Sequence, residues 1–521
     1  MKIGVRVGGF VLCLLLVGLM VGCGGEQPNP YGDGFVRGVP EDAGVASHGI
    51  TDFLEEVDNQ GLEVHSFMFL RRNRVIAEGW WYPYQRNIEH IMNSVTKTFT
   101  STAIGFAVQE KLLTVDDPVI SFFPEDLPET ISPNLEKLKI KHLLTMSAGQ
   151  APPPTFYITD DNWVKSFLAT PITDEPGTVF AYSSYASYML SAIISKVTGM
   201  NTMEYLQPRL FAPLDITGIK CETDTRGISS GGWGMRIKTA DMAKLGQFYL
   251  QNGKWKNKQL LNASWIKETS AVHIYQVPEP TFEQEMYDEG AQGYGYQVWR
   301  CTHNAYRADG ADGQFIVIMP DQEAVIITTC NTNQAHKVLA LIWEHIFPSI
   351  MDRPLKENRE ARAMLVSKLA SLALPDPFRT NEDVRIAKDE TRSYRMEPND
   401  KGIESISLAF NAKGECELRM RMQGSAYTFN FGQDLWLYGE TEKSGPYYLN
   451  LRRNPNGMAP FKVAGYGSWL SEEDLSLRLL YLSDNKYETY RCTFSEGKLQ
   501  LSLSNSMQPD EAPVILSGVQ E

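Results

Sequence analysis

The first half of the chain shows apolar positions at two different spacings. Between Ser94 and Leu113 they recur near helical spacing, at Phe99, Ala103, Phe106, Ala107 and Leu112, which predicts a long helix. Further helices are expected from Ser47 and over Gln334–Phe347. Short, strongly apolar runs predict strands at Glu63–Leu70, Val75–Trp81, Tyr294–Trp299, Gln314–Met319 and Ala324–Thr329.

The last third changes character. After an expected connecting helix over Lys356–Leu372, apolar and polar residues alternate in short runs from about Ser393 to Ser504. Ile406-Leu408-Phe410 and Leu418-Met420-Met422 are examples. Alternation of period two between turn residues is typical of an antiparallel meander, and the pattern leaves open a small barrel or a sandwich.

A chain of 521 residues is too long for one ordinary core. We therefore expect an α+β domain over 41–352, a helical linker over 353–392 and a smaller β-rich domain over 393–510. Residues 23–40 are rich in Gly and Pro and are interpreted as a flexible tether.

The first residues predict export. Lys2 and Arg6 precede an apolar run from Gly9 to Val21, which is typical of a signal peptide, here 1–22, and too short to remain as a spanning helix. Met20-Val21-Gly22-Cys23 resembles the lipobox of bacterial lipoproteins, in which the cysteine is diacylated. The expectation is an extracytoplasmic protein held on a bacterial membrane only by the lipid on Cys23; the alternative is an ordinary signal peptide with an incidental cysteine.

Charge and cysteine spacing exclude other classes. The formal net charge of −14, without a basic stripe, disfavours nucleic-acid binding. The cysteines and the eight scattered histidines show no metal-ligand spacing, so neither a metal nor another cofactor is expected. Cys416 and Cys492 could form a disulfide or remain buried thiols. The oligomeric state stays open.

Three short motifs bear candidate chemistry. In Ser94-Val95-Thr96-Lys97, residues three apart share one helical face, so the lysine amine can reach the serine hydroxyl. A serine hydroxyl is a weak nucleophile until a base takes its proton, and a backbone N–H at a helix start can hold an oxyanion. Tyr182 in Phe180-Ala181-Tyr182-Ser183-Ser184 could shuttle that proton. The segment from Ala308 to Gln314 contains Gly310, which allows close backbone approach. Each motif alone is weak: a solvated helix start, a packed tyrosine and a plain turn explain them equally well.

Together, the order and separation of the three motifs resemble the serine β-lactamase and penicillin-binding protein superfamily, especially its class C and esterase-like branch. Further likeness lies in Arg71-Arg72-Asn73, His142–Gly149, Pro176-Gly177-Thr178 and Gly231–Gly234, so that the resemblance spans about Pro40 to Ile350. It implies an antiparallel sheet flanked by helices, an all-helical subdomain and a site between them.

The resemblance also implies residue roles. Ser94 would be the acylated nucleophile, Lys97 its proton partner, and Tyr182 the general base and then acid. The N–H groups of Ser94 and Ala311 would hold the oxyanion, with Gly310 and Ser184 in the substrate site. Two residues depart from the family pattern: Ser184 replaces the Asn of Y-x-N, and Ala308 replaces the Lys or His of the third motif.

Two function classes follow. In one, the protein is a serine hydrolase acting on a small-molecule ester or amide (a small ester, a D-amino-acid peptide or a cyclic amide). In the other, it is acylated without turnover, as a penicillin-recognising sensor or cell-wall-binding lipoprotein. Gly227-Ile228-Ser229-Ser230-Gly231 matches the nucleophile elbow of α/β-hydrolases, but no strand is predicted before it and no helix after it. Because every required group precedes Gln314, the C-terminal domain is expected to supply stability or substrate access.

Overall fold

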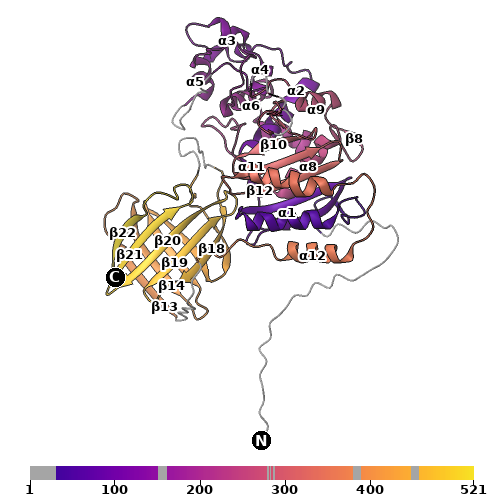
Figure 1. Ribbon diagram of the computed structural model, residues 1–521. Helices are drawn as coiled ribbons and strands as arrows, with labels where there is room; N and C mark the ends of the chain where they lie inside the picture. Colours follow the sequence, from indigo (N-terminus) through magenta and orange to yellow (C-terminus); the bar gives the residue numbers. More distant parts are fainter. Residues whose placement is uncertain are drawn as a thin grey trace.

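The computed structural model describes residues 31–521 except 151–160, 278–280, 282, 285–287, 379–388 and 448–456. The chain forms an α+β domain built on one large sheet, followed by a β-rich domain (Figure 1). The fold class predicted from the sequence is therefore confirmed.

The sheet of the first domain has the strand order β1-β3-β2-β12-β11-β10-β9. Its neighbours pair antiparallel, apart from the short parallel pair β1–β3. The bounds are β1 Val36–Arg37, β2 Val64–Arg71, β3 Arg74–Trp80, β9 Trp299–Arg300, β10 Tyr306–Gly310, β11 Gln314–Met319 and β12 Ala324–Cys330.

Helices cover both faces of this sheet, which explains why all of β2 is buried (Figure 1). Phe67 and Phe69 share a core with the terminal helices, whereas Met68 and Leu70 share the larger core under α2 and α8. The terminal helices are α1 Ser47–Asn59, α11 Ala335–Leu341, η6 Ile342–Ile346, η7 Phe347–Ser349 and α12 Arg359–Ala370.

The opposite face bears the helical subdomain and three short strands, β4 His90–Ile91, β5 Lys220–Cys221 and β6 Met235–Ile237, in the order β4-β6-β5. The hairpin of β7 Lys254–Trp255 and β8 Lys258–Gln259 follows α8. The helical elements are η1 Asn93–Val95, α2 Thr96–Gln109, η2 Val119–Phe122, η3 Pro124–Asp126, α3 Pro133–Lys137, α4 Ile140–Leu144, α5 Trp163–Ala169, α6 Ser184–Thr198, α7 Thr202–Leu206, η4 Gln207–Phe211, α8 Thr239–Leu250 and α9 Ala263–Ser270.

The C-terminal domain is a closed barrel rather than a sandwich. Its sheet runs β16-β15-β14-β13-β22-β21-β20-β19-β18-β17, and β16 also pairs with β18 through Gly432↔Tyr466, which closes the ring. The bounds are β13 Glu390–Met396, β14 Ile403–Phe410, β15 Cys416–Met422, β16 Ser425–Gln433, β17 Trp436–Thr441, β18 Phe461–Trp469, β19 Asp474–Tyr481, β20 Lys486–Ser495, β21 Lys498–Asn505 and β22 Val514–Gln520.

Three expectations need correction. The barrel includes β22, which lies beyond the predicted end of the domain at 510. The sequence did not predict this strand, because β22 buries only Leu516 and Gly518 and so lacks a strong apolar alternation. The predicted strand Tyr294–Trp299 is wrong except at its last residue, since left-handed Gln297 breaks it. The helix predicted from Ser94 begins as the 3₁₀ turn η1, and α2 ends at Gln109.

The structure decides the state of Cys416 and Cys492 but does not test the predicted lipid anchor on Cys23. Cys416 and Cys492 are buried free thiols. Cys23 and the predicted signal peptide lie outside the described residues. Among the residues that the structure does describe, no helix has the length and apolar character needed to span a bilayer.

Candidate active site

Ser94 lies in η1, between the short strand β4 and helix α2. Its neighbours Asn93 and Val95 are buried, whereas Ser94 keeps partial access to solvent. Asn93 has a left-handed backbone, with φ of 45°, which is uncommon for a residue with a side chain. Its amide nitrogen Nδ2 donates to the Ala311 carbonyl at 2.8 Å. The turn thus presents Ser94 next to the end of β10.

Lys97 lies one helical turn after Ser94, with only 1% of its surface exposed. Its Nζ is 2.9 Å from Ser94 Oγ, 3.1 Å from Ser184 Oγ and 2.6 Å from the Gly232 carbonyl oxygen. Gly232 brings that carbonyl close because its backbone packs against α6: a Cβ there would be 2.6 Å from the Ser184 carbonyl oxygen. Ser184 therefore contacts Lys97. From its place in the Y-x-N motif, the sequence analysis had expected Ser184 to bind substrate.

Tyr182 precedes α6 and joins the same group. Exclusion of water raises the pKa of the Tyr182 phenol above that of a free phenol, and the nearby Ser94 hydroxyl acts in the opposite direction. The Asp309 carboxylate raises this pKa further. Lys97 Nζ is 4.9 Å from the Tyr182 ring centroid, and Trp299 stacks on the same tyrosine with 5.6 Å between ring centroids. The resting phenol is therefore protonated at neutral pH.

The third motif forms the end of β10 and the turn η5 (Ala311–Gly313). A Cβ on Gly310 would collide with the Met92 carbonyl oxygen and would lie 2.9 Å from the Gln314 Cβ. Glycine therefore allows β10 to approach the segment that leads into Ser94. Ala311 is exposed at this edge, and its carbonyl accepts from Asn93 and Gln314.

Successive residues of β10 point to opposite faces of the sheet. Ala308 is buried in the core under α2 and α8. Arg307 and Asp309 face the other way, and Arg307 Nε donates to Asp309 Oδ2 at 2.8 Å. Arg307 also lies 3.6 Å from a Glu289 carboxylate oxygen. Arg307, the cation next to Ala308, is therefore already paired with the carboxylates of Asp309 and Glu289.

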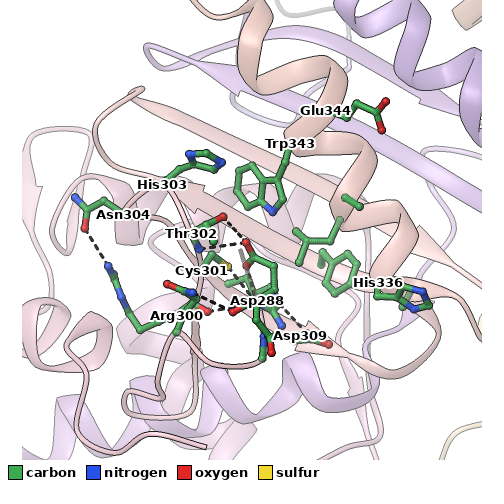
Figure 2. Close-up of a pocket in the computed structure, with 18 of the residues that line it drawn as sticks. Asp288, Arg300, Cys301, Thr302, His303, Asn304, Asp309, His336, Trp343 and Glu344 are labelled. Carbon is green, nitrogen blue, oxygen red and sulfur yellow. Dashed lines mark hydrogen bonds and ion pairs between the residues drawn. The ribbon is translucent and has the colours of Figure 1, made fainter. Parts of the chain in front are cut away.

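A cavity of about 1150 Å³ adjoins this face of β10, with α11 along one side (Figure 2). Asp309 lines it, and Figure 2 shows the side chains of Cys301, Thr302 and Trp343 around it. Asp309 thus borders this cavity while its charge also acts on Tyr182.

Ser229, the alternative nucleophile, has no such surroundings. It is 1% exposed, and its Oγ has no hydrogen-bond partner among the described residues. Before Ser229 the chain forms only an isolated β-bridge, between Thr223 and Ser229 itself. After Ser229 come a bend and then strand β6. A nucleophile elbow needs a strand directly before the serine and a helix directly after it, and neither is present.

The structure thus gathers Ser94, Ser184 and Tyr182 around Lys97. Gly310 and Ala311 lie against Met92 and Asn93, the two residues before Ser94. Sequence reasoning missed Gly232, Trp299 and Asp309 as neighbours of this group. Only Trp299 had a usable signal, the aromatic run Tyr294-Gly295-Tyr296-Gln297-Val298-Trp299, whose rings pack on Tyr182.

Comparison with known proteins defines the class. A model of the β-lactamase family matches residues 50–348, more than half of the 521 residues, so the chain belongs to the β-lactamase family of serine hydrolases. The 6-aminohexanoate-dimer hydrolase of Paenarthrobacter ureafaciens is 24% identical over 290 residues, which cover 50% of this chain and 71% of that protein.

Two other proteins extend the comparison. The lovastatin esterase of Penicillium rubens is 27% identical over 173 residues, covering 28% of this chain and 42% of the esterase. The octameric penicillin-binding protein homologue from Pyrococcus abyssi is 17% identical, with a TM-score of 0.46 over 90% of this chain and 99% of that one. The family thus includes relatives named for hydrolysis of amides and of esters.

Proposed function

We propose that this protein is a serine hydrolase that cleaves an ester or amide bond through an acyl-serine intermediate on Ser94. Candidate substrates are small esters, D-amino-acid peptides and cyclic amides. The observation that carries this proposal is the contact of 2.9 Å between Lys97 Nζ and Ser94 Oγ, in a site where Lys97 is buried and Ser94 is reachable. A nucleophile needs such an adjacent base.

The proposed first step transfers the Ser94 hydroxyl proton towards Lys97 while Oγ forms a bond to the substrate carbonyl carbon. The carbonyl π electrons move to oxygen, and the N–H groups of Ser94 and Ala311 hold that oxyanion. The carbonyl re-forms as the leaving group departs with a proton. Water then attacks the acyl carbon and gives one proton to the Tyr182 phenolate. As the acid leaves, Lys97 returns to Ser94 Oγ the proton that it took in the first step.

Tyr182 is proposed as the group that gives the leaving oxygen or nitrogen its proton. Its raised pKa keeps the phenol protonated at rest, which suits a general acid better than a resting base. The sequence interpretation made Tyr182 the base first. In the revised proposal, Lys97 takes the first proton and Tyr182 acts after it.

The substrate is proposed to be uncharged near the end of β10. Ala308 offers no cation, Arg307 is engaged by Asp309, and the Asp309 carboxylate would repel a substrate carboxylate. A hydrogen bond to a charged group is worth about 1.5–3 kcal/mol, and about 1.4 kcal/mol changes a rate tenfold. Carboxylate-bearing β-lactams should therefore be slower by roughly ten- to a hundredfold on this contact alone.

The test compares hydrolysis of short-chain aryl esters with hydrolysis of penicillins and cephalosporins by the purified protein. We expect measurable ester turnover and weak or no β-lactam turnover. Ala308→Lys and Asp309→Asn should each shift the ratio towards carboxylate substrates, whereas Ala305→Ser, at a buried position outside the site, should not. Efficient cephalosporin turnover by the unmodified protein would contradict the proposed substrate class.

The same assay separates hydrolysis from acylation without turnover. Sustained release of product supports the hydrolase, whereas a stoichiometric burst followed by silence supports the sensor or wall-binding alternative. Attachment to a membrane through Cys23 is a separate proposal that rests on the lipobox. Equal labelling of the wild type and Cys23→Ala by a palmitate analogue would reject it.

A further inference from the structure

The barrel inserts a polar turn into the first domain. The turn lies between β19 and β20, and its residues Asp484 and Asn485 are each 1% exposed, followed by Lys486 at 5%. Connecting turns normally lie on the surface because their polar groups need water. Here the partners of the turn are groups of the first domain.

Two of these residues, Asn485 and Lys486, bind to η5 and its neighbours, next to the candidate oxyanion donor Ala311. Lys486 Nζ is 2.8 Å from Asp312 Oδ2 and 2.7 Å from Asn331 Oδ1. Asn485 Nδ2 donates to the Cys330 carbonyl at 3.0 Å and to Asp312 Oδ2 at 3.3 Å. Asp312 directly follows Ala311, is buried, and has φ of 68°. A left-handed aspartate persists only where its surroundings hold it.

The third residue binds β6, the strand that pairs with the segment leading to Ser94. Asp484 Oδ1 accepts from Arg236 Nε at 2.6 Å, and Arg236 also binds Glu222 at 3.0 Å. Arg236 belongs to β6, where it pairs with Ile91 of β4. Ile91 lies three residues before Ser94. One turn of the barrel therefore touches η5 directly and, through Arg236, the strand that pairs with the segment before Ser94.

We infer that the β19–β20 turn is a positioning element of the active site, in which Lys486 and Asn485 fix η5 and thereby the Ala311 N–H. This inference rests on the proposed function, because it takes that N–H as an oxyanion donor. The physical reason is the buried Asp312 carboxylate: without Lys486 it would lose its cationic partner, and a buried uncompensated charge moves towards water. A shift of about 1 Å at a catalytic group can cost on the order of a hundredfold in rate.

The test is Lys486→Met in the full chain, with Lys462→Met as the matched control. Lys462 makes another contact between the two domains, with Glu89 at 2.7 Å, and does not touch η5. Three measurements are needed: the rate of acylation by an activated aryl ester, kcat and KM for that ester, and amide hydrogen exchange at residues 310–313.

We expect Lys486→Met to slow acylation on the order of ten- to a hundredfold, to lower kcat with little change in KM, and to speed exchange at 310–313. The control should change none of these. Adding Asp312→Asn to Lys486→Met should restore part of the rate, because a neutral amide then replaces the buried carboxylate that has lost its lysine. If Lys486→Met does not fold, Asn485→Ala should show the same pattern more weakly.

Unchanged acylation and unchanged exchange in a folded Lys486→Met or Asn485→Ala protein would overturn the inference. The exchange measurement does not depend on the nucleophile. If the wild type were not acylated at Ser94, the proposed function would fail, whereas the exchange difference would still decide whether the barrel turn fixes η5.

Discussion

Lys97 Nζ lies among the Ser94 hydroxyl, the Ser184 hydroxyl and the Gly232 carbonyl. The carbonyl can only accept, so one N–H of Lys97 is committed to it. A neutral amine has one further N–H, which Ser184 can accept, and a lone pair that can receive the Ser94 proton. The three contacts equally fit the three N–H donors of an ammonium. Attack requires the neutral form, whose lone pair would then face Ser94 Oγ.

If Ser94, Lys97 and Tyr182 act as one unit, removal of any two should cost little more than removal of one. Lys97→Ala and Tyr182→Phe should each lower the acylation rate by several orders of magnitude, and the double variant should be close to either single variant. Rapid-quench kinetics with an aryl ester measures these rates. Tyr249→Phe, which loses a buried hydroxyl bonded to Thr102, is the control. Fully additive losses would mean that the proton path is wrong.

At the scale of elements, the site depends on how closely the end of β10 approaches the segment before η1. Asn93 joins the two by a side-chain hydrogen bond to Ala311, and Gly310 leaves room for the Met92 carbonyl. Both contacts are between backbone segments more than two hundred residues apart. Neither depends on the substrate, so the gap between the Ser94 and Ala311 N–H groups is set before binding.

Gly310→Ala should therefore disturb this gap. Its new Cβ would collide with the Met92 carbonyl oxygen, and the backbone shift that relieves the collision should slow acylation on the order of a hundredfold. Gly439→Ala in the barrel is the control, because the nearest atom to its Cβ would be 3.7 Å away. Acylation rates are compared after the melting temperatures show that both variants fold. Equal rates for Gly310→Ala and the wild type would show that the approach is not needed.

The sequence predicted elements well where apolar periodicity was strong. Gln314–Met319 matches β11 at both ends. Motif order predicted that Ser94, Lys97 and Tyr182 lie together, and they do. The sequence did not predict strand β10, because Arg307 and Asp309 interrupt its apolar pattern. These two charged residues face the cavity and bind each other, which the local sequence does not reveal. The choice between barrel and sandwich could not be made, since closure depends on the β16–β18 pairing, which local alternation does not encode.

At the scale of the whole molecule, a chain of buried and half-buried polar contacts connects the two domains. Lys486 binds Asn331, Asn331 binds Glu63, and Glu63 binds His65 at 3.0 Å. His65 is in turn 2.8 Å from His90. Tyr84 stacks on His65 and belongs to the apolar cluster shared with barrel residues such as Trp436. The interface therefore contains ionisable groups without access to water.

This interface predicts acid sensitivity. Burial, and the neighbouring His65, lower the pKa of His90 well below its ordinary value, which is about 6.5 in an unfolded chain. Below about pH 6.5 the unfolded chain therefore binds a proton that the folded protein does not, and stability falls as pH decreases, by up to about 1.4 kcal/mol per unit for this group. Urea unfolding between pH 8 and pH 5 measures the slope. His90→Gln should flatten it, whereas replacement of exposed His48 by Gln should not; equal slopes in all three proteins would reject this origin.

The most direct test is the identity of the residue that a fluorophosphonate phosphonylates. The full chain is treated with a fluorophosphonate, digested, and the modified peptide is sequenced by mass spectrometry. The account predicts one adduct, on Ser94, and loss of both labelling and ester turnover in Ser94→Ala, with Ser229→Ala nearly unchanged. An adduct on Ser229, or undiminished turnover by Ser94→Ala, would contradict it.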